Sequence, residues 1–356
     1  MYLLPFFLIR LLAPWLRPLR ALVARGWLVE AELDAVLAML HPAWRLNRVF
    51  ARVEGREWVG DDLLALRLRC NGNARGWRAG QHVQLYLQLD GVRHGRSYSL
   101  TRVDAHGRVE LGIRRQPGGR LSNPLLDRVE VGQLLELGQA QGELRWPQQG
   151  CGVALLAAGS GITALLGLLR EALAQGYAAP VQLLHYVREA GQRAYRDELQ
   201  QLMARHPNLR VRWLLTGQGG ERFQPAHLLE MAGMALLACG PAGFVAAVRE
   251  AWGGPLQHEA FSPSPRVAVA GQALRLEFVQ SRLQVAGDGA RSLLEQAEAA
   301  GLRPAHGCRQ GICAGCTCSL LGGAVRDLRS GETLAEPGQA IRICVSAPLG
   351  DVRVDL

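Results

Sequence analysis

Hydrophobic residues follow different periods in successive stretches of this chain, and each period predicts a different structure. Between Val49 and Trp146, apolar and polar residues alternate in short runs broken by Gly and Asn, for example in residues 63–69, 82–88 and 108–114. A period of two is typical of half-buried strands. About six such runs over roughly 100 residues predict an antiparallel β-barrel.

The pattern changes after the barrel. Continuous apolar runs at residues 153–158, 181–186, 211–215 and 235–239 alternate with helical segments up to Phe261. Fully apolar strands separated by helices are typical of a parallel sheet, so this part is expected to be an α/β domain. The last 90 or so residues show two strands, an amphipathic helix near residues 293–300, a cysteine-bearing loop and closing strands, an α+β pattern.

These patterns divide the chain into five segments. Ser262-Pro-Ser-Pro265 is typical of a stiff linker. We therefore expect a multidomain protein with a helical extension, a β-barrel, an α/β domain, a linker and an α+β domain, at residues 1–48, 49–148, 149–262, 263–268 and 269–356.

The extension is apolar, carries Arg10, Arg17, Arg20 and Arg25, and has no acidic residue before Glu30. Charge and proline interrupt it too early for a transmembrane helix, and it lacks the layout of a signal peptide. Two short helices are expected. These helices either lie at a membrane interface through residues 1–28 or cap the protein's own surface. The protein is therefore expected in the cytoplasm, and in the first case at the inner face of the membrane.

The net charge is +9 and all forty basic residues are arginine. No basic run or recognition motif accompanies this charge, so nucleic acid is not expected as a partner.

Four cysteines near the C-terminus carry the clearest chemistry. Cys308, Cys313 and Cys316 have the spacing C-x4-C-x2-C, and Cys344 follows 28 positions after Cys316. This is the plant-type ferredoxin spacing for a 2Fe–2S cluster. A structural zinc site would more often pair C-x2-C units or include histidine. A Rieske centre is excluded because no histidine follows Cys308, and Cys318 is expected to be a spare thiol beside the loop.

Two further sets of residues precede the cysteines. In the barrel, Arg96-Ser-Tyr98-Ser99 ends a strand, and Gly119-Arg-Leu121-Ser122 opens a helical turn that either holds a phosphate or is an ordinary capped helix. In the α/β domain, a glycine turn with Gly159, Gly161 and Thr163 follows the first strand. Cys239-Gly240-Pro241 follows a later strand, so both loops should border one crevice.

In their order these motifs resemble the ferredoxin–NADP reductase superfamily with a plant-type ferredoxin domain fused at the C-terminus. The resemblance implies an NAD(P)H-dependent oxidoreductase that uses FAD, with FMN less favoured, and a 2Fe–2S cluster. It assigns flavin contacts to Arg96, Tyr98, Ser99, Arg114, Gly119, Leu121, Ser122 and Phe261. It assigns nicotinamide contacts to Gly159, Gly161, Thr163, Arg188, Gly240 and Pro241, and catalytic roles to Ser99, Cys239 and Glu259.

Arg188 ends the second strand of the α/β domain, where an arginine suits a 2′-phosphate. NADPH is therefore favoured over NADH, unless Arg188 lies on a solvated helix face. The resemblance implies an oxygenase or desaturase as electron acceptor, and the apolar extension favours a membrane fatty-acyl desaturase. The alternatives are the reductase of a soluble or ring-hydroxylating oxygenase and a redox-sensing cluster protein.

Overall fold

The computed structural model describes residues 3–89, 92–119, 121–147, 150–217, 219–261, 274–307, 309, 311 and 314–356. Its contacts divide the chain into two compact units, Met1–Glu259 and Ala260–Leu356. The expected linker at Ser262 to Pro265 lies outside the described residues, as do Cys308 and Cys313.

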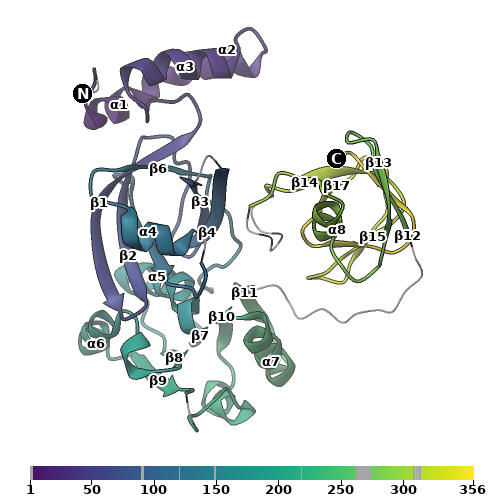
Figure 1. Ribbon diagram of the computed structural model, residues 1–356. Coiled ribbons are helices and arrows are strands. Elements are labelled where there is room, and N and C mark those ends of the chain that lie inside the picture. Colours follow the sequence, from purple (N-terminus) through teal and green to yellow (C-terminus); the bar gives the residue numbers. More distant parts are fainter. Residues whose placement is uncertain are drawn as a thin grey trace. The chain divides into compact units, whose positions relative to one another are not determined.

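The barrel is antiparallel and closed, as predicted. Its strands run in the order β1-β2-β5-β4-β3-β6 (Figure 1). Alternate residues such as Leu66 and Leu85 point into a shared hydrophobic core, to which α4 adds Leu125. The elements are β1 (Val49–Gly60), β2 (Leu63–Cys70), β3 (His82–Leu89), β4 (Val92–Val103), β5 (Arg108–Arg114), α4 (Ser122–Arg128) and β6 (Leu134–Leu137).

The α/β domain has a five-stranded sheet in the order β11-β10-β7-β8-β9, in which β10, β7, β8 and β9 are parallel. The chain moves from β7 outward to β9 and then crosses back to β10, so the strand order reverses beside β7. The elements are β7 (Val153–Ala158), η2 (Gly159–Gly161), α5 (Ile162–Ala174), β8 (Val181–Val187), η3 (Ala190–Gln192), α6 (Arg196–Arg205), β9 (Leu209–Leu215), η4 (Pro225–Met231), β10 (Ala235–Gly240), α7 (Ala242–Trp252) and β11 (Leu256–Ala260).

Helix α5 joins this domain to the barrel by lying against β4. Gly167 makes the contact possible, because a Cβ there would stand 2.6 Å from the Leu100 carbonyl oxygen and 2.8 Å from the Gly80 nitrogen. One turn later, the Arg170 guanidinium reaches Glu198 Oε1 at 2.7 Å and Glu110 Oε1 at 2.9 Å. A buried ion-pair network therefore fixes the two domains against each other.

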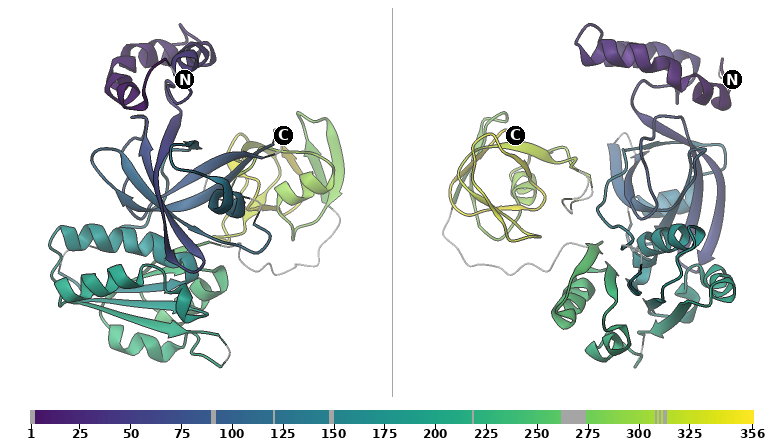
Figure 2. Two further views of the ribbon diagram at one scale, coloured as in Figure 1. Left: turned by 60° about the vertical axis from the view of Figure 1, so that its left-hand side comes forward. Right: turned by 180° about the vertical axis from the view of Figure 1, so that it is seen from behind.

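The N-terminal extension forms α1 (Phe6–Leu12), η1 (Ala13–Leu16), α2 (Arg17–Ala24) and α3 (Glu30–Leu40). The expectation of two short helices was wrong. Pro14 and Pro18 each stand in the first turn of a new helical segment, and Gly26, with a φ of 73°, follows the end of α2. Figures 1 and 2 show these helices at the end of the barrel that lies away from the α/β sheet.

One face of the extension packs on the barrel. Ile9 and Leu46 are fully buried. The Arg20 side chain donates to Asn73 Oδ1 at 2.7 Å, and Asn71 Nδ2 donates to the Ala43 carbonyl oxygen at 2.8 Å. The expected cap on the protein's own surface is therefore present on this face.

The second unit is an α+β domain built on a five-stranded sheet in the order β13-β12-β19-β14-β17, with a three-stranded sheet β16-β15-β18. Helix α8 begins at Ser292, whose side chain caps it, and confirms the amphipathic helix expected there. The elements are β12 (Leu274–Phe278), β13 (Leu283–Gly287), α8 (Leu293–Ala299), β14 (Thr317–Gly322), β15 (Val325–Asp327), β16 (Thr333–Leu334), β17 (Ala340–Arg342), β18 (Ser346–Pro348) and β19 (Val352–Val354).

Candidate functional site

The two loops of the α/β domain meet at the point where the strand order reverses. A Cβ on Gly161 would overlap the Cys239 carbonyl group, and a Cβ on Gly240 would lie 2.8 Å from the Ala158 side chain. The glycines thus let the turn after β7 touch the loop after β10. The hydroxyl of Thr163 donates to the Ser160 carbonyl oxygen at 2.9 Å and holds the turn closed.

The crevice expected beside these loops would have β3 and β4 of the barrel as its other side. His82 on β3 lies opposite Ser99 on β4, and both are buried. His82 Nδ1 lies 2.9 Å from Oε1 of Glu259, which belongs to β11. The fold therefore brings Ser99 and Glu259, two predicted catalytic residues, to the same histidine.

Several buried polar atoms in this crevice have no hydrogen-bond partner among the described residues. They are His82 Nε2, Gln84 Oε1 and Glu259 Oε2. A buried polar atom without a partner costs about 1–3 kcal/mol, so native proteins rarely leave several together. A flat heteroaromatic ligand with donors and acceptors on its edge, such as a flavin or a nicotinamide, fits this arrangement.

Cys239 borders the same crevice but its side chain is fully buried. Burial, and then the nearby Glu259 carboxyl group, raise the pKa of this thiol well above its usual value. Cys239 is therefore a neutral thiol at physiological pH, suited to contact with an uncharged ring rather than to nucleophilic attack.

Arg96 and Tyr98 lie on the opposite face of β4 from Ser99. Tyr98 faces Val83 and packs against the barrel core, and burial raises the pKa of its phenol. Arg96 is exposed on the same strand. The tyrosine thus has a fixed ring position and stays neutral, as a stacking residue requires.

Arg114 and the turn at Gly119 extend this part of the barrel. Arg114 Nε donates to Asp62 Oδ2 at 2.7 Å, and its guanidinium leaves no room for a Cβ on Gly159, so Arg114 reaches the glycine turn of the α/β domain. Leu121 is buried. A Cβ on Gly119 would overlap the Ser122 hydroxyl. Because Gly119 has no side chain, this hydroxyl can lie against the turn.

The coenzyme end of the crevice contains one residue that the sequence analysis did not select. His185 is fully buried on β8, and its Nε2 lies 3.0 Å from the Gly159 carbonyl oxygen. Burial lowers the pKa of His185 to about 4, so the ring is neutral. Arg188 is exposed just past the end of β8, outside any helix, whereas Arg196 is ion-paired with Asp197.

In the second unit, Cys316 and Cys344 are both buried. The Gly311 amide, from the expected cluster loop, donates to Cys344 Sγ at 3.2 Å, and the Arg342 side chain donates to the Gly311 carbonyl oxygen. Gly311 has a φ of 69° and Ala314 a φ of 52°, so both residues have the left-handed backbone conformation. An amide directed at a buried sulfur stabilises a thiolate, which fits a cluster ligand.

Cys318 differs from these two cysteines. It lies on β14 and packs against the hydrophobic core of the unit. Burial, and then the neighbouring Cys316, raise the pKa of its thiol to about 12. A neutral thiol against the core agrees with the expectation of a spare cysteine.

Comparison with known families places each domain. Residues 51–146 match an oxidoreductase FAD-binding domain, residues 155–250 an oxidoreductase NAD-binding domain, and residues 278–349 a 2Fe-2S iron-sulfur cluster binding domain. An NADPH oxidoreductase from Mycobacterium tuberculosis is 31% identical over 338 residues, which is 91% of this chain and 88% of that protein. The chain belongs to the ferredoxin–NADP reductase superfamily, with a 2Fe–2S ferredoxin domain at its C-terminus.

Other members of this reductase family match over most of their length. A toluene-4-sulfonate monooxygenase system reductase subunit from Comamonas testosteroni is 30% identical over 81% of this chain and 92% of that protein. Phthalate dioxygenase reductase has the same fold, with a TM-score of 0.61 at 21% identity over 87% of this chain and 98% of that chain. The chain spans about half the length of the flavohemoproteins that it also matches, from 42% to 55%, and 42% of a self-sufficient cytochrome P450.

These findings confirm the predicted fold class, the oxidoreductase activity and the three cofactor domains, for FAD, NAD(P) and a 2Fe–2S cluster. The zinc alternative for the cysteines was wrong, because the C-terminal domain is a 2Fe–2S domain. Among the described residues, no helix is long and apolar enough to cross a bilayer.

Proposed function

We propose that this reductase uses NADPH and supplies single electrons to a membrane-bound fatty-acyl desaturase, touching the membrane through its N-terminal helices. When bound, FAD would supply the chemistry that couples a two-electron hydride donor to a one-electron iron–sulfur cluster. The role of the chain is to bind the nicotinamide and flavin rings in one dry crevice and to hold four thiolates around the cluster, through Cys308, Cys313, Cys316 and Cys344.

The observation that carries the membrane part is the outer face of the extension. Phe7, Leu11 and Trp15 are spaced four residues apart and are 64%, 65% and 79% exposed. Because α1 already buries Phe6 and Ile9 on its inner face, this outer row has no packing role. Exposed aromatic and aliphatic residues beside arginines are typical of helices that lie in a membrane interface.

Within the crevice, we assign the flavin to the barrel and the coenzyme to the loops after β7 and β10. Ser99, His82 and Glu259 would contact the edges of the two rings where these meet, and Cys239 would add a neutral thiol from the nicotinamide side. Phe261 belongs to the second unit, and its role as an aromatic shield of the flavin stays a prediction.

The preference for NADPH rests on Arg188. Arg188 directly follows β8. Among the described residues its guanidinium has no side-chain partner, so it is free to pair with a 2′-phosphate. The name of the mycobacterial relative, an NADPH oxidoreductase, supports the same choice.

The test of this function compares one triple variant with one single-substitution control, both in the full chain. Phe7→Ser, Leu11→Ser and Trp15→Ser together should abolish co-sedimentation with anionic vesicles and NADPH-driven desaturation, while NADPH–ferricyanide reduction stays unchanged. Leu229→Ser is the control, because Leu229 is 78% exposed on η4 of the α/β domain. Equal desaturation by the triple variant and the control would exclude a membrane role for the extension.

A second candidate is the reductase of a soluble oxygenase. It is favoured by the toluene-4-sulfonate monooxygenase system reductase subunit, which matches over 92% of its length. In that case the triple variant would couple to its acceptor as well as the unmodified chain, and vesicles would have no effect on turnover.

A further inference from the structure

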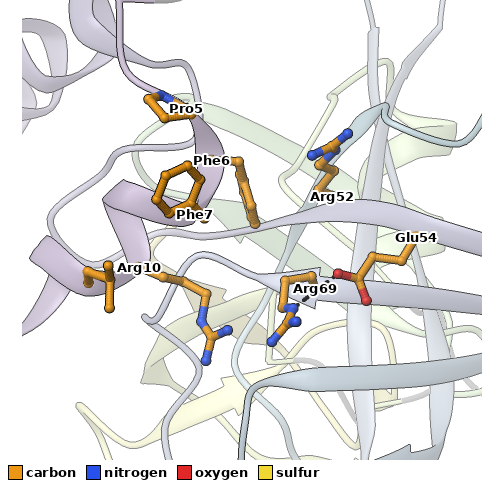
Figure 3. A pocket seen from close by; sticks show the side chains of 8 residues that line it. Pro5, Phe6, Phe7, Arg10, Arg52, Glu54 and Arg69 are labelled. Atoms are coloured by element: carbon orange, nitrogen blue, oxygen red, sulfur yellow. Dashed lines mark hydrogen bonds and ion pairs between the residues drawn. The ribbon is translucent and has the colours of Figure 1, made fainter.

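A pocket of about 400 Å³ lies between α1 and the outer surface of the barrel, apart from the flavin crevice (Figure 3). Its apolar wall comes from α1 and its polar floor from β1 and β2. The lining residues are Pro5, Phe6, Phe7, Arg10, Leu11, Arg52, Glu54 and Arg69. A pocket with one apolar and one cationic side suits an amphiphile with an anionic head.

The floor of the pocket holds an unusual row of like charges. Arg52 on β1 lies directly opposite Arg69 on β2, which lies directly opposite Arg108 on β5. Like charges at directly opposed positions of an antiparallel pair are destabilising. Such a row needs anions nearby to be tolerated.

The protein supplies only part of that compensation. Glu54 accepts from Arg69 at 3.1 Å and from Arg108 at 3.0 Å, and Asp104 lies 4.0 Å from Arg108, so two carboxylates serve the row. Among the described residues, the side chains of Arg10 and Arg52 have no hydrogen-bond or ion-pair partner. Both line the pocket, and Figure 3 shows Arg10 beside Arg69 and Arg52 on the other side of Phe6.

Arg10 lies close to this row. Burial, and then the charge of Arg69, lower its pKa, while Asp104 acts to raise it. The guanidinium of Arg10 also reaches Gly107, at the turn before β5, where a Cβ would stand 3.8 Å from its Nη2. It therefore lies over the arginine row rather than in open solvent, and an anion between them would be held from both sides.

The apolar wall of the pocket is continuous with the exposed face of the extension. Phe7 and Leu11 line the pocket and are also the first two residues of the exposed row that ends at Trp15. A ligand with its head on the arginines would thus have its chains along the surface that faces the bilayer.

We propose that this pocket binds the headgroup of one anionic phospholipid, with the phosphodiester at the arginine side chains that line it and the acyl chains against Phe7 and Leu11. The proposal rests on the membrane contact proposed above and gives that contact a specific lipid. It makes docking of the reductase dependent on anionic lipid rather than on any bilayer.

The experiment uses the full chain and a lipid that forms no membrane. Dihexanoyl phosphatidylglycerol below its micellar concentration is titrated by calorimetry into the unmodified chain, into the pocket variant Arg10→Gln/Arg52→Gln, and into the control Arg17→Gln/Arg25→Gln. The control removes the same charge from exposed positions of the extension. Ferricyanide reduction by NADPH should be equal in all three, because none of these residues lies in the crevice.

We expect the pocket variant to bind the short-chain lipid at least tenfold more weakly, and the control to match the unmodified chain. Inorganic phosphate should bind to the unmodified chain at least tenfold more weakly than the short-chain lipid, because phosphate makes no contact with the apolar wall. Equal binding of phosphate and lipid, or equal losses in the two variants, would overturn the proposal. Absence of vesicle binding by the unmodified chain would refute the membrane contact, whereas absence of short-chain lipid binding would refute the pocket alone.

Discussion

Two buried polar clusters lie where the barrel meets the α/β domain, and they differ in how completely their atoms are paired. In the Arg170 cluster, the guanidinium contacts Glu198, Glu110 and the Thr101 carbonyl oxygen, and Thr101 in turn donates to Glu110. In the His82 cluster, three buried polar atoms have no partner among the described residues. The same interface thus contains one satisfied and one unsatisfied group of polar side chains.

The difference separates structure from function. A fully paired network in a low-dielectric site fixes one arrangement of the two domains, whereas unpaired atoms cost free energy until a ligand pairs them. We infer that the Arg170 cluster holds the domains together and that the His82 cluster is kept for the rings of the cofactor and coenzyme. Each prediction below tests one side of this contrast.

The largest effect is expected from Arg170→Met. It leaves Glu110 buried without its cation, which should lower the free energy of unfolding by about 3–5 kcal/mol. The melting temperature of the first unit should fall by roughly 2–4 °C per kcal/mol. Arg102→Met is the control, because Arg102 also pairs with Glu198 but is 59% exposed, and its effect should stay within about 0.5 kcal/mol. Equal effects of the two variants would show that the network is not structural.

The next effect concerns the unsatisfied cluster. Replacing both partners, His82→Phe with Glu259→Leu, should leave the free energy of unfolding within about 1 kcal/mol, because an apolar pair of similar shape removes the buried polar atoms. NADPH–ferricyanide turnover should fall about a hundredfold, the scale of a lost proton-positioning group. Calorimetry and steady-state kinetics on the same preparation check both. If the double variant is strongly destabilised but its folded fraction keeps full turnover, the His82 cluster is structural, like the Arg170 cluster.

A smaller effect is expected from Arg188→Ala. Loss of one charge-assisted contact with a 2′-phosphate should raise the KM for NADPH about tenfold and leave the KM for NADH unchanged. Arg196→Ala is the matched control, because Arg196 is already paired with Asp197. A parallel rise for both coenzymes would show that Arg188 does not read the phosphate.

The last prediction concerns acid. Burial acts to raise the pKa of Glu110, but Arg170 and Thr101 outweigh it and hold the pKa below its usual value of 4.5. Stability from Glu110 is therefore fully present above pH 4.5 and is lost as the pH falls through the lower folded-state pKa. Urea unfolding between pH 6 and 3, at roughly half-unit steps, should show a decline that Glu110→Gln makes shallower. Parallel declines in both proteins would assign the acid sensitivity to other carboxylates.

The candidate site was predicted in part. The glycine turn at Gly159 and the loop at Cys239 were found because each follows a buried strand, and parallel strands end on one edge of a sheet. His82 and Gln84 were missed, although they lie on an alternating strand, because nothing local marks which polar residues will be buried. Only the pairing of β3 with β4 and the return of β11 bring His82 to Glu259, which is 177 positions away in the sequence.

The extension shows the same limit in another form. Its apolar composition was equally consistent with an anchor at a membrane interface and with a cap, and the structure contains a cap whose other face is apolar and exposed. Which residues occupy each face depends on where prolines divide the helices. The arginine row behind α1 depends on strand register, because Arg52, Arg69 and Arg108 are far apart in the chain.

The sequence alone determined the domain types, the cluster ligand spacing and the loops that border the crevice, because periodicity and short motifs are local properties of a chain. The tertiary structure alone decided which polar groups are paired, which are left for a ligand, and where like charges gather. These are properties of contacts between distant segments, and their energies depend on burial and register, neither of which a local pattern contains.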